Sequence, residues 1–81
     1  MEKAQIERTL REIIAKRVRG VVAEQIDPSQ ELAALGVDSL AFSWILADME
    51  DAFDFVMRSS DILKLKTLTM AVEFVAEHRK P

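Results

Sequence analysis

The residue with the clearest chemical potential is Ser39, which directly follows Asp38 in the stretch ELAALGVDSLAFSWI, residues 31–45. A serine hydroxyl becomes a good nucleophile when a base such as histidine takes its proton. The only histidine is His78, at the far end of the sequence, and GVDSL is not the Gly-x-Ser-x-Gly turn of serine hydrolases. Self-contained catalysis is therefore disfavoured. Two interpretations stay open: Ser39 helps to start a helix, or its hydroxyl is an attachment point for another group.

The position of Ser39 at the predicted start of a helix bears on what it could carry. Ser and Asp are both favoured at helix N-termini, but one cap is enough, and Asp38 is the predicted N-cap. A phosphate attached to Ser39 would lie beside the free N–H groups and the positive end of the helix dipole. These groups stabilise an exposed anion by roughly 0.3–1 kcal/mol. A phosphodiester at Ser39 is therefore physically favourable.

The composition indicates one small globular domain, residues 1–81. Hydrophobic residues make up 49% of the chain, charged residues make up 31%, and there is no cysteine for a disulfide framework. No apolar run approaches the roughly 18 residues of a membrane span, and the N-terminus does not resemble a signal peptide. We therefore expect no membrane span and a cytoplasmic location.

Charge is distributed unevenly along the chain. Residues 1–20 carry six basic and three acidic side chains (net +3), and residues 21–81 carry five basic and eleven acidic side chains (net −6). An acidic surface repels nucleic acid and attracts basic partners. The sequence also lacks a glycine-containing calcium loop and a glycine-rich phosphate loop. We predict neither nucleic-acid binding nor a metal site.

Hydrophobic periodicity predicts an all-α fold, a small four-helix bundle made of three main helices and one short helix. The first main helix is expected at residues 3–19, where Ile6, Leu10, Ile13, Ile14 and Val18 form an apolar stripe. The second is expected from Ser39 to about Asp54. The third begins after Thr67, its predicted N-cap.

The remaining segments are a long connection, residues 20–38, and the short helix. A helical turn is expected near residues 29–34, and Asp27-Pro28-Ser29 has turn chemistry. Ser59 or Ser60 is expected to cap the short helix, which includes residues 62–65. The predicted contacts of the long connection with the core are Ile26, Leu32 and Leu35.

The predicted second helix has two faces. The face expected to join the core consists of Phe42, Ile45, Leu46, Met49, Phe53 and Val56. The other face combines apolar and acidic residues at helical spacing: Leu40, Trp44, Ala47, Asp48 and Asp51. We predict that this second face is exposed and contacts partner proteins, with Trp44 as a candidate anchor. An alternative is that Trp44 folds over the core or over a group attached nearby.

These features together resemble a known family. The segment LAALGVDSL, residues 32–40, is similar to the attachment motif of acyl carrier proteins and peptidyl carrier domains. The similarity extends over nearly the whole chain and includes Ile26-Asp27, Phe53 and Thr67-Leu68. The resemblance implies a non-catalytic carrier that holds an acyl or aminoacyl group as a thioester and presents it to partner enzymes.

The same resemblance implies roles for single residues. Ser39 would carry 4′-phosphopantetheine, transferred from coenzyme A by a phosphopantetheinyl transferase. Asp38 would assist that enzyme near its magnesium ion, and Leu40 would contact partners beside the prosthetic group. The thiol of the arm would hold the cargo, which suits a chain without cysteine. Other implied partners are a loading ligase or acyltransferase and a downstream transferase or synthase, acting on a carrier that we expect to be a monomer.

The sequence departs from the family pattern in its second helix. Trp44 occupies a position where an acid is common, and the following stretch DFVMRSSD carries Arg58. These departures favour a specialised carrier over the housekeeping fatty-acid carrier. Stand-alone bacterial carriers loaded with an amino acid are one such group, and polyketide or lipid carriers are others.

A different class of function is an unmodified helical interaction module. Such a module would bind a partner through Leu40 and Trp44 and would use Ser39 only to start the helix. Modification of Ser39 separates the two hypotheses.

Overall fold

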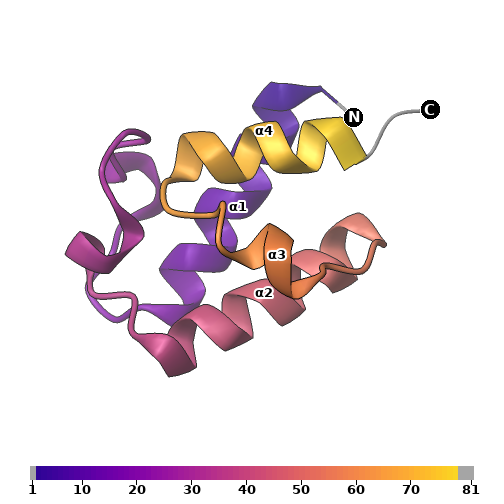
Figure 1. Cartoon of the computed structure of the whole chain (residues 1–81). Coiled ribbons are helices and arrows are strands. Elements are labelled where there is room, and N and C mark those ends of the chain that lie inside the picture. Colours follow the sequence, from indigo (N-terminus) through magenta and orange to yellow (C-terminus); the bar gives the residue numbers. More distant parts are fainter. Residues whose placement is uncertain (1, 79–81) are drawn as a thin grey trace.

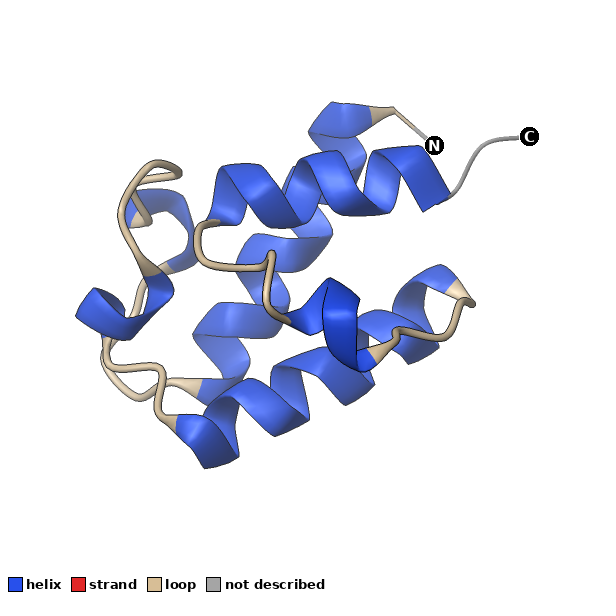
Figure 2. Ribbon diagram, viewed as in Figure 1, coloured by secondary structure: helices blue, strands red, loops and turns tan. Residues whose placement is uncertain are grey.

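The fold is all-α, as predicted, in a computed structural model that describes residues 2–78. Within these residues no β-strand is present (Figure 2). The helix α1 packs against both α2 and α4, and the short α3 follows α2 (Figure 1). In chain order the elements are α1 (Lys3–Arg17), the 3₁₀ turns η1 (Ala23–Gln25) and η2 (Leu32–Leu35), α2 (Ser39–Phe53), α3 (Ser59–Ile62) and α4 (Leu68–His78).

The first helix contributes its predicted apolar stripe to the core. All five residues of the stripe are buried. The helix ends at Arg17, two residues before the predicted end, because Val18 already has extended backbone angles. Gly20 then adopts a φ of +84°, a conformation that residues with a side chain rarely adopt.

The long connection is attached to α1 and to the loop that leads into α4. The Arg11 guanidinium donates hydrogen bonds from Nη1 to the carbonyls of Ala23 (2.7 Å) and Ile26 (2.9 Å). The N–H of Leu32 donates to the carbonyl of Lys66 at 2.8 Å. The predicted anchors are confirmed, since Ile26 and Leu32 are buried and Leu35 packs against the core. The predicted turn near residues 29–34 is η2, whereas η1 was not predicted.

The second helix begins at Ser39 and buries Ile45, Met49 and Phe53. It ends where Asp54 takes a left-handed conformation, with a φ of +53°. Beyond this point the residues alternate between inward and outward positions, so that Phe55 and Met57 pack against the core. The prediction that Val56 belongs to the core is wrong. It is 83% exposed, because the helical spacing on which the prediction relied stops before it.

The third helix is a single turn, and its predicted cap is wrong. Arg58 is the N-cap residue, and its N–H donates to Oδ2 of Asp61 at 3.1 Å. Ser59 and Ser60 are therefore the first two residues of the helix and do not cap it. The acceptor of the capping hydrogen bond is the Asp61 carboxylate, which lies inside the turn. The helix ends at Ile62, so the following residues, predicted to be helical, form a loop from which Leu65 is buried.

The last helix confirms its predicted cap. The Thr67 hydroxyl oxygen accepts a hydrogen bond from the N–H of Met70 at 3.1 Å. The residues of α4 that are buried are Leu68, Ala71, Val72, Phe74 and Val75. The sequence predicts a basic end for this helix at His78, Arg79 and Lys80, of which the last two lie outside the described residues.

Candidate functional site

The start of α2 places Ser39 as predicted from the sequence. Asp38 has extended backbone angles, and its Oδ1 accepts a hydrogen bond from the N–H of Ala41 at 2.8 Å. Ser39 is the first residue of the helix and is exposed. Its carbonyl accepts a hydrogen bond from the Ser43 hydroxyl at 3.1 Å. Asp38 thus supplies the cap, and the Ser39 hydroxyl is not needed for that purpose.

This geometry suits a phosphate on the Ser39 hydroxyl. The first N–H groups of an α-helix have no partner within the helix, and they point toward its N-terminal end. The Asp38 carboxylate accepts the hydrogen bond of the Ala41 N–H. The 15-residue α2 directs its positive dipole end toward the same region. A phosphodiester attached at Ser39 would therefore lie where an anion is stabilised.

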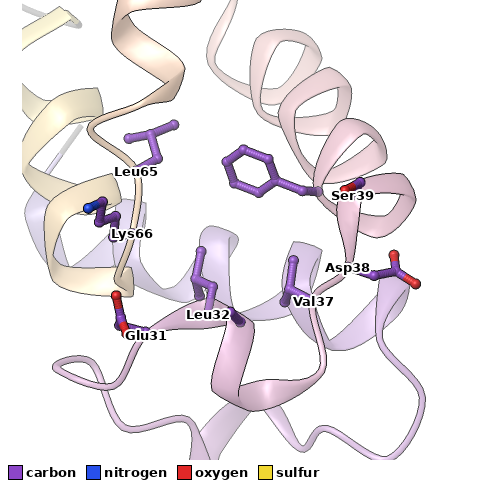
Figure 3. Close-up of a pocket in the computed structure, with 9 residues that line it drawn as sticks. Glu31, Leu32, Val37, Asp38, Ser39, Leu65 and Lys66 are labelled. Carbon is purple, nitrogen blue, oxygen red and sulfur yellow. The ribbon is translucent and has the colours of Figure 1, made fainter.

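A pocket of about 300 Å³ lies directly beside Ser39. Its walls come from the η2 region, the start of α2 and the loop between α3 and α4 (Figure 3). The Asp38 carboxylate points away from it in this view. The pocket is at the small end of the range for ligand sites, which begins near 300 Å³. Its lining residues are Glu31, Leu32, Ala33, Val37, Asp38, Ser39, Phe42, Leu65 and Lys66.

The predicted partner face of α2 is mostly exposed. Leu40 is 59% exposed and Trp44 is 47% exposed, so two large apolar side chains lie one turn apart on the surface of α2. Ala47 and Asp51 are also exposed, and Asp48 is half-buried. Trp44 thus does not fold into the core.

A basic residue from α1 joins this face, which the sequence analysis did not predict. The Arg17 guanidinium donates hydrogen bonds to Asp48 from Nε (2.7 Å, to Oδ2) and from Nη2 (2.9 Å, to Oδ1). Its central carbon lies 5.3 Å from the centroid of the Trp44 ring, a cation–π distance. The hydrogen bond from Arg17 lowers the pKa of the Asp48 carboxyl, to which nearby Lys16 adds a smaller effect, and it raises the pKa of Arg17.

No local sequence signal indicates this contact. Trp44 and Asp48 are four residues apart on one helix and share a face, but the cation comes from a position 31 residues before Asp48. By its position in the sequence, Arg17 is simply a basic residue in the last turn of α1, where the helix dipole favours a cation. The contact depends on how α1 packs against α2, which is a tertiary property.

The arrangement offers no catalytic base to Ser39. The His78 ring lies 4.0 Å from the Phe74 ring, centroid to centroid, and its Nδ1 is 2.9 Å from the Phe74 carbonyl oxygen. It occupies the C-terminal end of α4, far from the start of α2 (Figure 1). Among residues 2–78, no group of three or more His, Cys, Asp or Glu side chains is placed to hold a metal ion. Over the same range, no helix is long and apolar enough to cross a membrane.

A small helical bundle with an exposed serine at the start of its second main helix, beside a pocket, defines the class of phosphopantetheine-bearing carriers. The family model described as "Phosphopantetheine attachment site" matches residues 8–75, and the chain belongs to this family. It is 35% identical over 71 residues to an acyl carrier protein of Desulforapulum autotrophicum, covering 86% of this chain and 92% of the relative. It is 30% identical over 78 residues to an acyl carrier protein of Chlorobium phaeobacteroides, covering 95% and 99%.

Membership establishes the chemical role of the chain. It is a non-catalytic carrier whose cofactor is covalent 4′-phosphopantetheine, and it holds an acyl or aminoacyl group as a thioester for partner enzymes. Carriers of this kind act with transferases and synthases. The thiol of the cofactor provides the reactive group that a chain without cysteine lacks.

Proposed function

We propose that Ser39 is the residue to which 4′-phosphopantetheine is attached. The observation that carries this proposal is the division of labour at the start of α2: Asp38 caps the helix and leaves the neighbouring hydroxyl exposed. The free N–H groups of the first turn would hold the phosphate. The cofactor, when attached, supplies the thiol on which the cargo is carried.

The residues around Ser39 have distinct parts in this proposal. The Asp38 carboxylate points away from the pocket, so it is accessible to a phosphopantetheinyl transferase and its magnesium ion. The exposed Leu40 side chain lies next to the attachment point and contacts the enzyme that docks there. The apolar walls from Leu32, Val37 and Leu65 give part of the arm or its cargo a place to pack.

The proposed docking face is the exposed side of α2, consisting of Leu40, Trp44, Ala47, Asp48 and Asp51. A phosphopantetheinyl transferase, a loading ligase or acyltransferase, and a downstream transferase or synthase would bind there in turn. Tethering of the cargo raises its effective concentration at each active site, so that weak and brief docking is sufficient. We propose a cytoplasmic monomer consisting of one carrier domain.

Trp44 distinguishes this face from a purely acidic one, which supports a specialised carrier with its own loading enzyme. An amino acid loaded by a dedicated ligase is one proposed cargo, and an acyl group is the other. The relatives named acyl carrier proteins favour the acyl cargo. The loaded mass of the holo protein, measured with candidate ligases and both kinds of substrate, separates the two.

Intact mass spectrometry tests the attachment site. The folded apo protein is incubated with a broad-specificity phosphopantetheinyl transferase, magnesium and coenzyme A, and it should gain the mass of one phosphopantetheine. Ser39→Ala should abolish the gain. Ser43→Ala is the matched control, because Ser43 is an exposed serine one turn further along α2, and this variant should still be modified. No gain by folded wild-type protein would refute the proposal and favour an unmodified interaction module.

A further inference from the structure

Arg17, Trp44 and Asp48 form one cluster, called here the tryptophan cluster. Asp48 holds the Arg17 guanidinium through two hydrogen bonds of 2.7 and 2.9 Å, and the guanidinium lies against the Trp44 ring. A planar guanidinium that donates from both Nε and Nη2 to one carboxylate has little freedom to rotate. Arg17 therefore restricts the positions that the exposed indole ring can take.

The cluster also changes the electrostatics of the docking face. A groove between α1 and α2 is lined by Glu12 and Lys16 from α1 and by Asp48 and Asp51 from α2, and Arg17 is paired with Asp48. The pair formed by Arg17 and Asp48 is formally neutral, whereas Glu12, Lys16 and Asp51 in the adjoining groove sum to −1. Consequently the tryptophan cluster itself carries no net charge, although the chain as a whole is acidic at −3.

We infer that Arg17 is a positioning residue of the docking face, and that the face is matched to a loading enzyme with an apolar pocket for the Trp44 ring and few basic residues around it. Charge complementarity selects this partner, because the neutral pair of Arg17 and Asp48 offers little to a basic surface while Trp44, which is 47% exposed, remains available for burial. The inference rests on the proposed docking role of α2. Neither the resemblance to carriers nor the family match assigns a role to Arg17.

Collisional quenching of fluorescence tests the cluster without a partner. Trp44 is the only tryptophan and the chain has no tyrosine, so the emission reports on this ring alone. Iodide and caesium quench according to the local charge, and acrylamide reports exposure. Ionic strength is held constant near 0.1 M, where the Debye length is about 10 Å. In the wild type, the iodide-to-caesium quenching ratio should equal that of neutral N-acetyltryptophanamide.

Substitutions should move this ratio in opposite directions. Arg17→Ala leaves Asp48 unpaired, which should lower the ratio about two- to fourfold and increase quenching by acrylamide. Asp48→Asn leaves Arg17 unpaired and should raise the ratio by a similar factor. The double variant should restore the ratio but not the protection from acrylamide. Arg8→Ala is the matched control, because Arg8 is exposed on α1 beside Glu24 and changes the net charge equally.

A caesium preference in the wild type would refute the neutrality of the tryptophan cluster, and acrylamide quenching unchanged by Arg17→Ala would refute the positioning role. The partner is tested with the enzyme that loads the holo protein in the mass assay. Its KM for the wild-type carrier should change less than about twofold between roughly 50 and 300 mM NaCl. Arg17→Ala should raise KM with kcat unchanged, whereas a lower KM would indicate a basic partner. If phosphopantetheine is not attached at Ser39, the mass assay shows no gain, but the quenching ratios of the apo protein do not change.

Discussion

The two roles assigned to Asp38 can be separated by two substitutions at the same position. Its Oδ1 accepts the N–H of Ala41 at 2.8 Å, which is a capping role. Its carboxylate charge is the feature that a transferase with magnesium would use. Asp38→Ala removes both the acceptor and the charge. Asp38→Asn keeps an acceptor of the same shape and removes only the charge.

The expected stabilities follow from the capping geometry. Replacing an Asp cap by Ala costs about 1 kcal/mol, within a range of roughly 0.5–2. For a domain of this size, that cost lowers Tm by about 4–8 °C. Asn caps about as well as Asp, so Asp38→Asn should lose only the interaction with the helix dipole, about 0.3 kcal/mol at an exposed site. Its Tm should therefore fall by no more than about 3 °C.

The expected modification rates follow a different order. Both variants lack the carboxylate, so both should show a similar decrease in kcat/KM for phosphopantetheinylation, although their stabilities differ. Thermal unfolding followed by circular dichroism and modification followed by intact mass give the two quantities. Asp54→Asn is a control that removes a carboxylate from the opposite end of α2. Modification of Asp38→Asn at the wild-type rate would show that Asp38 only caps the helix, and a wild-type Tm for Asp38→Ala would exclude the capping contribution.

Three further predictions concern docking, backbone conformation and pH. Trp44→Ala should raise the KM of the loading enzyme about tenfold or more while changing phosphopantetheinylation far less; an equal effect on both reactions would remove its assigned role. Gly36→Ala should lower stability by about 1–2 kcal/mol in urea titrations, because its φ is +95° although a Cβ would meet only Val18 Cγ1 at 3.7 Å; an unchanged midpoint would contradict this. Asp27 accepts hydrogen bonds from the Ser29 backbone and side chain, and Asp48 accepts hydrogen bonds from the Arg17 side chain. These hydrogen bonds lower the pKa of both carboxyls. Their stabilising effect should be present above the unfolded value near 4 and be lost as the pH falls through the folded pKa. In the variants Asp27→Asn and Asp48→Asn, the urea midpoint should therefore fall less than in the wild type as the pH drops below about 4.

Features that depend on neighbouring residues were predictable from the sequence. The caps at Asp38 and Thr67 were predicted from residue type and position, and both accept the expected backbone N–H. The turn at Asp27 was also predicted, and its Oδ1 accepts the Ser29 N–H at 3.0 Å. The position of Ser39 as the first residue of α2 follows from the same reasoning, because a cap on the preceding residue fixes where the helix begins.

Features that depend on where a helix ends or how two helices pack were not predictable. Val56 continues the apolar spacing of α2, yet the left-handed Asp54 ends the helix before that spacing reaches it. Arg58 caps α3 only because Asp61 lies within reach of its N–H. The contact between Arg17 and Asp48 requires two helices to be placed side by side, and no spacing along one chain encodes that distance.

The tryptophan cluster suggests how one carrier fold can discriminate among partner enzymes. Specificity is a difference between two binding free energies, so a surface gains selectivity as much by weakening the wrong partner as by strengthening the right one. An acidic α2 would attract any enzyme with a basic docking surface and would speed its association. Neutralising Asp48 with Arg17 weakens that general attraction, and the same guanidinium places Trp44 where a fitted apolar pocket can bury it. A single residue of α1 would then make the carrier a poor substrate for enzymes that recognise acidic carriers and a good one for its own.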